Sequence, residues 1–184
     1  PALNVLPPPL GRNDMTGGPN TVVNLALRVA QRGIPVRLVT TMQTSSADPA
    51  WLGRHFAALL GTATLPEAAL VSAAEPGQPL PVGAGDLFMG THWTTVQQLK
   101  TVLPRFGSQR FFYLLQDFEP SFYPWSGNHA AALETFALEF WPVFNESLLA
   151  AFFQARQPGR FADPATSERA IIFEPAVDER LFHP

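Results

Sequence analysis

The 184-residue sequence carries 12 Lys and Arg against 15 Asp and Glu, a formal charge of −3, and it has no cysteine. The acidic balance argues against nucleic-acid binding, which normally needs a basic face, and the lack of cysteine excludes disulfides, thiolate zinc sites and a cysteine nucleophile. A hydrophobic fraction of 46% is too high for a disordered chain, and neither a membrane span nor a signal peptide is visible, so we expect a soluble, cytoplasmic globular domain.

The first part of the sequence predicts a strand, a loop, a helix and a second strand. The apolar run Leu3–Leu6 is closed by Pro7–Pro9, which a central strand could not contain. Apolar residues at helical spacing follow, and Gly33 is the expected C-cap of that helix. The elements expected here are a strand at Leu3–Leu6, a loop at Gly11–Gly18, a helix that starts at Pro19 or Asn20, and a strand at Pro35–Thr41.

The same alternation continues towards the C-terminus. Helices are expected from Asp48 to Leu60, after Trp93 up to Leu103, around Asn128–Phe140 and over Ser147–Ala155. Strands are expected at Ala68–Ser72, Asp86–Gly90, Arg110–Gln116, Pro142–Phe144 and Ala170–Phe173, with loops at Glu75–Gly85 and Asp117–Ser126. The pattern predicts an α/β domain, a Rossmann-like doubly wound parallel sheet of about six or seven strands with helices on both faces.

Ligands of open α/β sheets bind beyond the carboxyl ends of the strands, so the loops there hold the candidate residues. Gly17 and Gly18 follow the first strand, where glycines let a ligand approach the backbone and a helix N-terminus offers free N–H groups. Neither a G-x-G-x-x-G nor a Walker A sequence is present. A tight turn without a ligand is the structural alternative.

His92 follows the strand expected at Asp86–Gly90, with Trp93 beside it. A histidine at this place can donate a hydrogen bond to a hydroxyl or act as a base near neutral pH. The structural alternative is a histidine that bonds to a neighbouring carbonyl or caps the next helix.

The most distinctive segment runs from Gln116 to Trp125, directly after the strongest expected strand. Asp117 and Glu119 lie two positions apart, so an extended chain would point both to the same side. Tyr123 and Trp125 belong to the aromatic residues of this segment, and a sugar packs its C–H face on such rings while its hydroxyls bond to carboxylates. The alternative is that the aromatic residues simply pack, although buried unpaired carboxylates would then be costly.

Asn145 lies between a short strand and a helix and is a further candidate for substrate binding, although Asn145 or Ser147 could instead cap that helix. The histidines are scattered, and no pair has the spacing of metal ligands. We therefore expect no metal site.

Taken together, these segments resemble the N-terminal, acceptor-side domain of retaining, nucleotide-sugar-dependent glycosyltransferases of the GT-B fold. The matching pieces are Gly17–Gly18 with the helix and strand that follow, Gly85–Leu87 up to His92, Phe144–Ser147 and the closing stretch Phe173–Pro184. Leu115–Pro120 running into Phe122–Trp125 is similar to a segment of bacterial rhamnosyltransferases of polysaccharide and surface-glycan synthesis.

The resemblance implies an acceptor-binding domain at residues 1–174, and at 175–184 the start of a linker to a C-terminal domain that binds most of the nucleotide-sugar donor. Gly17 and Gly18 would lie in the cleft between the domains, near the donor phosphates or the sugar. His92 would contact the donor sugar or the acceptor, and Asp117 with Glu119 would line the acceptor pocket. Their roles would be positioning and charge stabilisation.

The complete enzyme would move a sugar, L-rhamnose from a dTDP donor, onto a growing polysaccharide or glycan without a metal or other cofactor. Association of this enzyme with a membrane surface is a further expectation, and the 184 residues alone should be inactive. The alternatives are a flavodoxin-like or other Rossmann-like binding module without transferase activity, and a sugar-nucleotide epimerase or reductase. The absent dinucleotide glycines disfavour the last of these.

Overall fold

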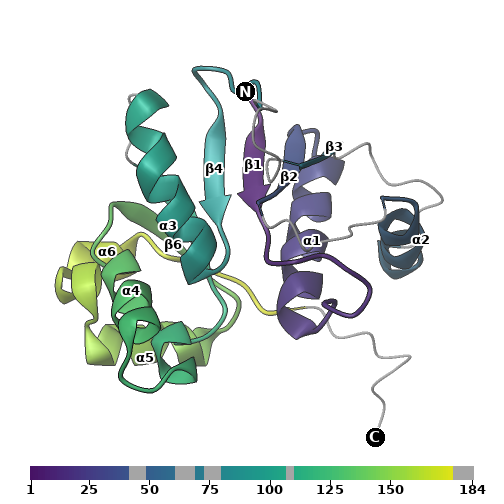
Figure 1. Ribbon diagram of the computed structural model, residues 1–184. Helices are drawn as coiled ribbons and strands as arrows, with labels where there is room; N and C mark the ends of the chain where they lie inside the picture. The colour runs from purple at the N-terminus through teal and green to yellow at the C-terminus, as the bar shows by residue number, and fades with distance from the viewer. Residues whose placement is uncertain (42–48, 61–68, 73–79, 107–109, 176–184) are drawn as a thin grey trace, which may run out of the picture.

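The structure is a computed structural model that describes residues 1–41, 49–60, 69–72, 80–106 and 110–175. Its strands form one sheet in the order β3-β2-β1-β4-β5-β6-β7, and each neighbouring pair is parallel (Figure 1). The strands are β1 (Leu3–Leu6), β2 (Val36–Thr40), β3 (Ala69–Ser72), β4 (Leu87–Gly90), β5 (Phe111–Leu115), β6 (Phe140–Phe144) and β7 (Ile171–Ile172). The strand order reverses between β1 and β4, which confirms the predicted Rossmann-like, doubly wound fold.

Helices cover both faces of the sheet. The α-helices are α1 (Gly17–Gln31), α2 (Pro49–Leu60), α3 (Trp93–Val102), α4 (Gly127–Thr135), α5 (Ser147–Arg156) and α6 (Pro164–Glu168). Short 3₁₀ helices are η1 (Leu103–Phe106), η2 (Glu119–Phe122) and η3 (Gly159–Ala162). Buried side chains of α1 and α2 pack on one face of the sheet, whereas those of α3 and α5 pack on the other.

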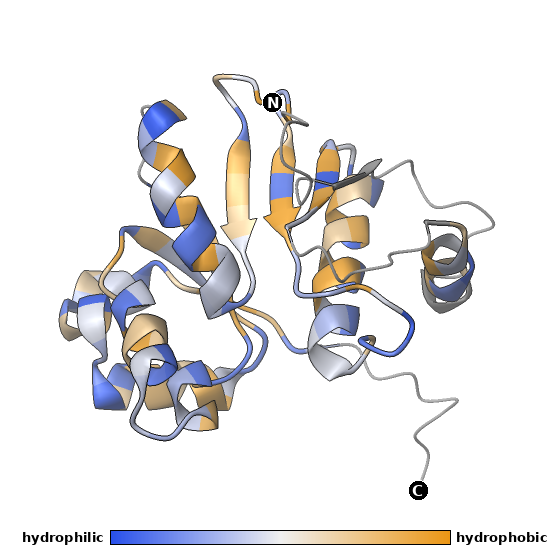
Figure 2. Ribbon diagram, viewed as in Figure 1, coloured by the Kyte–Doolittle hydropathy of each residue, from blue (hydrophilic) through white to orange (hydrophobic). Residues whose placement is uncertain are grey.

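Two hydrophobic clusters follow directly from the alternation of side chains along the strands. Val5 and Leu38 face the cluster under α1, and their neighbours Leu6 and Val39 face the cluster under α3. A parallel strand that is buried on both sides must be apolar at nearly every position. This is why β1 and β4 are coloured mainly as hydrophobic in Figure 2.

Some of the predicted boundaries are wrong. Helix α1 starts at Gly17, two residues before Pro19, and α4 ends at Thr135 because Phe140 already pairs with Phe111 in the sheet. The turn η3 and helix α6 between α5 and β7 were not expected. The cap expected at Asp48 and the linker residues from 176 onwards lie outside the described residues.

Gly90 lets helix α3 approach the end of β4 closely. A Cβ atom at this position would lie 2.6 Å from Cγ2 of Val96 and 3.3 Å from Cδ1 of Leu99. Both residues are buried in α3. The contact therefore places the N-terminus of α3, with His92 as its N-cap, at the carboxyl edge of the sheet.

Candidate functional site

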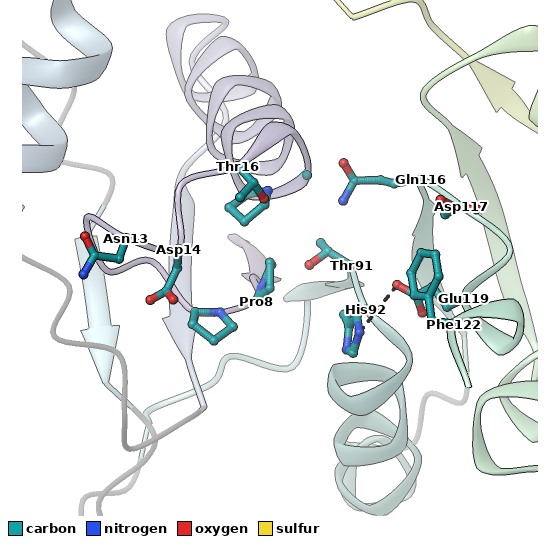
Figure 3. Close-up of a pocket in the computed structure, with 13 residues that line it drawn as sticks. Pro8, Asn13, Asp14, Thr16, Thr91, His92, Gln116, Asp117, Glu119 and Phe122 are labelled. Atoms are coloured by element: carbon teal, nitrogen blue, oxygen red, sulfur yellow. Dashed lines mark ion pairs between the residues drawn. The ribbon is translucent and has the colours of Figure 1, made fainter. Parts of the chain in front are cut away.

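A cleft of about 560 Å³ opens beyond the carboxyl ends of β1, β4 and β5, where the strand order reverses (Figure 3). Ligands of doubly wound folds bind at such a point. The residues that line it are Pro8, Pro9, Asn13, Asp14, Thr16, Gly18, Pro19, Thr91, His92, Gln116, Asp117, Glu119 and Phe122. They come from three loops and the helix ends beside them, so the cleft exists only in the folded sheet.

The first turn of α1 forms one wall of the cleft. Its N-cap Thr16 makes no side-chain capping hydrogen bond, and Gly17 and Gly18 are the first two helical residues. Neither glycine has a positive φ, and both belong to the helix rather than to a separate tight turn. A Cβ at Gly18 would lie 3.7 Å from Nε2 of Gln116 across the cleft, which is an ordinary contact. The backbone does not require glycine here, and the small residue instead leaves room beside Gln116.

His92 caps helix α3, as the structural alternative predicted, and its ring also lines the cleft. Nδ1 accepts a hydrogen bond from the backbone N–H of Thr94 at 3.3 Å. A backbone N–H can only donate, and the Thr94 hydroxyl, 2.8 Å from Nδ1, can donate as well, so this cap assigns the proton of the neutral ring to Nε2. Burial lowers the pKa of His92, which favours this neutral form. The cap thus leaves an N–H donor at the other side of the ring.

Glu119 connects the loop after β5 to the start of α3. Its Oε2 accepts a hydrogen bond from the backbone N–H of Trp93 at 2.7 Å, which places a carboxylate at the helix N-terminus. The residue is 8% exposed. Burial raises the pKa of Glu119 to about 7, the N–H of Trp93 opposes this, and the charge of Asp117 adds to it.

The other oxygen of Glu119 faces His92. Oε1 lies 3.9 Å from Nε2 of His92, which is too long for a direct hydrogen bond (dashed line in Figure 3). Nε2–H of His92 is a donor, Oε1 of Glu119 is an acceptor when the carboxyl group is ionised, and both residues line the cleft. A ligand hydroxyl between them could accept from Nε2–H and donate to Oε1 at the same time. This arrangement suits a hydroxyl better than a phosphate, which has no proton to donate when fully ionised.

The charge of the cleft also argues against a phosphate beside these two residues. Its lining includes the carboxyl groups of Asp14, Asp117 and Glu119, whereas none of the described residues that line it is Lys or Arg. Asp14 accepts a hydrogen bond from the N–H of Gly11 at 3.0 Å, and Asp117 accepts one from the N–H of Phe118 at 2.7 Å. Like charges repel an anionic ligand. The carboxyl groups therefore disfavour an anionic ligand at the side of the cleft that Asp117 and Glu119 line.

The structure brings together four of the nine residues predicted from the sequence: Gly18, His92, Asp117 and Glu119 all line the cleft. Trp93 and Tyr123 are not part of this lining and contact each other instead. Nε1 of Trp93 donates to the hydroxyl of Tyr123 at 3.0 Å, and the two rings pack edge to face.

Gly17, Trp125 and Asn145 also lie outside the lining of the cleft. Trp125 is highly exposed and stacks on His129. Asn145 is half-buried between β6 and α5, and its backbone N–H donates to the carbonyl of Leu115 at 3.4 Å.

The expected capping of α5 by Asn145 or Ser147 is wrong. Glu146 occupies the N-cap position without a side-chain capping bond. The backbone N–H of Ser147 instead donates to Oε1 of Glu174 at 3.1 Å. Like Glu119 at α3, Glu174 comes from a distant part of the chain, so local sequence carries no signal for this cap.

Many residues that line the cleft are not among those predicted from the sequence. The sequence pattern places Pro8 and Pro9 at the end of a strand, and Asn13, Asp14 and Thr16 in a loop. Gln116 and Phe122 stand in the segment that was singled out, so their membership could have been inferred from it. The lining residues that were not predicted are Pro8, Pro9, Asn13, Asp14, Thr16, Pro19, Thr91, Gln116 and Phe122.

Two further features concern metals and membranes. In the part of the chain that the structure describes, no group of three or more His, Asp or Glu side chains is placed to hold a metal ion. Among the same residues, no helix combines the length and apolar character needed to cross a membrane.

Comparison with known proteins gives two matches. The model of the family described as "WsaF, N-terminal domain" matches residues 2–146. Over 103 residues the chain is 33% identical to the O-antigen biosynthesis protein RfbC of Myxococcus xanthus. The matched stretch covers 55% of this chain but 7% of RfbC, so the chain spans a small fraction of that relative.

Proposed function

Since the chain belongs to the family of the WsaF N-terminal domain, an N-terminal domain of a glycosyltransferase, we propose that its cleft binds the sugar acceptor of such an enzyme. The complete protein would transfer a sugar onto a growing polysaccharide. The name of the relative in O-antigen biosynthesis supports a polysaccharide as the product class.

The observation that carries this proposal is the acidic cleft, in whose lining a hydrogen-bond donor, Nε2 of His92, lies beside an acceptor, Oε1 of Glu119. An acceptor sugar is neutral and offers several hydroxyls, each of which can both donate and accept. One hydroxyl would lie between Nε2 of His92 and Oε1 of Glu119, and a second would donate to the exposed carboxylate of Asp117. The diphosphate of a nucleotide sugar would find no cation among these groups.

In the transfer, the acceptor oxygen forms a bond to the anomeric carbon and gives up its proton, and the bond between that carbon and the diphosphate breaks. The leaving diphosphate takes the electron pair of that bond and the proton. His92, Asp117 and Glu119 would hold the acceptor hydroxyl in position for this step. Positioning of this kind lowers the barrier because the entropy of bringing the reactants together is lost on binding rather than in the reaction.

The finer parts of the proposal concern the donor. We expect L-rhamnose from a dTDP donor, held mainly by a C-terminal domain, with no metal or other cofactor. The 184 residues alone should then be inactive, and turnover by them at a rate comparable with the complete gene product would contradict this. Association of the complete enzyme with a membrane surface stays a prediction.

The variant Asp117→Asn tests the role of the cleft. The amide keeps the oxygen that accepts from the N–H of Phe118 but removes the charge that would bind the acceptor. Loss of a hydrogen bond to a charged group costs about 1.5–3 kcal/mol, so kcat/KM of the complete enzyme should fall roughly ten- to hundredfold.

The matched control is Glu134→Gln, which removes an exposed carboxylate that pairs with Lys100 on the surface. Both variants should unfold within about 0.5 kcal/mol of the parent. If Asp117→Asn lost stability in parallel with activity, or kept full activity, Asp117 would not bind the acceptor.

A further inference from the structure

We propose that Trp125 is a second sugar subsite, which binds a pyranose ring farther along a polymeric acceptor than the ring in the cleft. The inference rests on the proposed function and goes beyond it, because it makes the enzyme sensitive to acceptor length. Three observations support it: the Trp125 ring stacks on a histidine, it is exposed to solvent, and it follows a lining residue of the cleft by three positions.

The Trp125 ring is supported from behind. It stacks on His129 with ring centroids 5.1 Å apart and an angle of 28° between the planes. His129 is itself held twice: its backbone N–H donates to Oγ of Ser126 at 3.3 Å, and Nδ1 lies 2.9 Å from the carbonyl oxygen of Pro120. These contacts tie the start of α4 to η2 and hold His129 as the surface on which the indole stacks.

The exposure of Trp125 is not explained by packing. An apolar residue directly before an N-cap commonly packs on the fourth helical residue and fixes the entry of the chain. Trp125 stands at that position before the N-cap Ser126, but it is 93% exposed. The free energy gained by removing so little apolar surface from water is small. A large ring that is fixed and yet left in water is suited to bind a ligand.

Trp125 follows Phe122, a lining residue of the cleft, by three positions in the chain. Phe122 lines the cleft and is 57% exposed, and three residues of chain span at most about 11 Å. Tyr123, between them, is anchored by its hydrogen bond to Trp93. Aromatic side chains thus follow the acidic groups Asp117 and Glu119 along the chain, and Trp125 lies within about 11 Å of the lining residue Phe122.

The aromatic residues from Phe122 to Trp125 are suited to bind a chain of neutral sugars. A pyranose ring packs its C–H face on an aromatic ring, and its hydroxyls remain in water. A nucleobase can also stack on a tryptophan, and the donor carries one. The test therefore measures the KM of donor and acceptor separately.

The experiment uses the complete enzyme with a rhamnose disaccharide and a rhamnose octasaccharide as acceptors. Trp125→Ala should raise the KM for the octasaccharide about three- to tenfold, because an aromatic contact is lost. The KM for the disaccharide and for the donor should stay unchanged, because neither reaches Trp125. His129→Ala should raise the KM for the octasaccharide less than Trp125→Ala does.

The matched control is Trp141→Ala, a second exposed tryptophan, which stands near the start of β6 and packs on Phe112. It should leave both acceptor KM values at those of the parent. Equal effects of Trp125→Ala on both acceptors, a raised donor KM, or no effect would each overturn the inference. Failure of the parent enzyme to transfer a sugar to any glycan acceptor would overturn the proposed function, and the inference with it.

Discussion

Replacing Glu119 by Gln should remove the loss of folding stability that ionisation of this buried carboxyl group causes at high pH. The carboxyl group is buried at the N-terminus of α3, where one oxygen accepts from the N–H of Trp93. Glutamine has nearly the same shape, keeps an oxygen for this hydrogen bond and cannot ionise. The variant therefore isolates the charge of Glu119 from its contacts.

The sign and size of the effect follow from the pKa. Burial raises the pKa of Glu119 from 4.5 to about 7, so the folded chain binds this proton more tightly than the unfolded chain. The stability contributed by the protonated group is fully present below pH 4.5 and is lost as the pH rises through about 7. A shift of roughly 2.5 units corresponds to about 3 kcal/mol.

The assay is urea unfolding of the 184-residue chain and of Glu119→Gln at about pH 4 and about pH 8.5. The free energy of unfolding of the variant, relative to the parent, should increase by about 3 kcal/mol between these values. Glu134→Gln is the control: Glu134 is exposed and bonded to Lys100, which lowers its pKa, so any change should have the opposite sign. A constant difference between Glu119→Gln and the parent would refute the reasoning.

Two further predictions concern glycines. Gly18→Ala should leave the melting temperature equal or higher, because alanine is favoured in a helix. Its methyl group beside Gln116 should nevertheless raise the KM for the acceptor. In the control Gly17→Ala, the new methyl group would contact nothing within 4 Å, so the KM should stay unchanged. Gly90→Ala should cost about 1–3 kcal/mol in urea unfolding because its Cβ would overlap Val96, and a cost below about 0.5 kcal/mol would contradict the close packing of α3 on β4.

The structure also changes what we expect of Glu119→Ala. From the sequence, loss of the Glu119 carboxylate is expected to reduce sugar transfer while the fold stays near that of the parent. Because Glu119 accepts from the N–H of Trp93, truncation leaves a donor at the start of α3 without its partner. We therefore expect Glu119→Ala to lose stability as well as activity, so that Asp117→Asn is the cleaner test of acceptor binding.

The strands and the order of elements were predictable because the signals are local. Apolar runs such as Leu3–Leu6 reflect burial on both faces of the sheet, and Pro7–Pro9 ends the first strand since proline cannot join a ladder of hydrogen bonds. Gly33 lies just beyond α1 with a φ of 83°, the left-handed region that favours glycine. The end of α4 was not predictable, because pairing of Phe140 with Phe111 in the sheet decided it.

The amino-acid sequence by itself determined the parallel α/β fold, the resemblance to a glycosyltransferase domain, and the loops in which candidate residues stand. Tertiary structure alone decided which of those residues share one cleft. Glu119 meets the N–H of Trp93 from 26 positions away, and Glu174 caps α5 at Ser147 from 27 positions away. Such contacts depend on the register of neighbouring strands, and no local pattern of residues encodes that register.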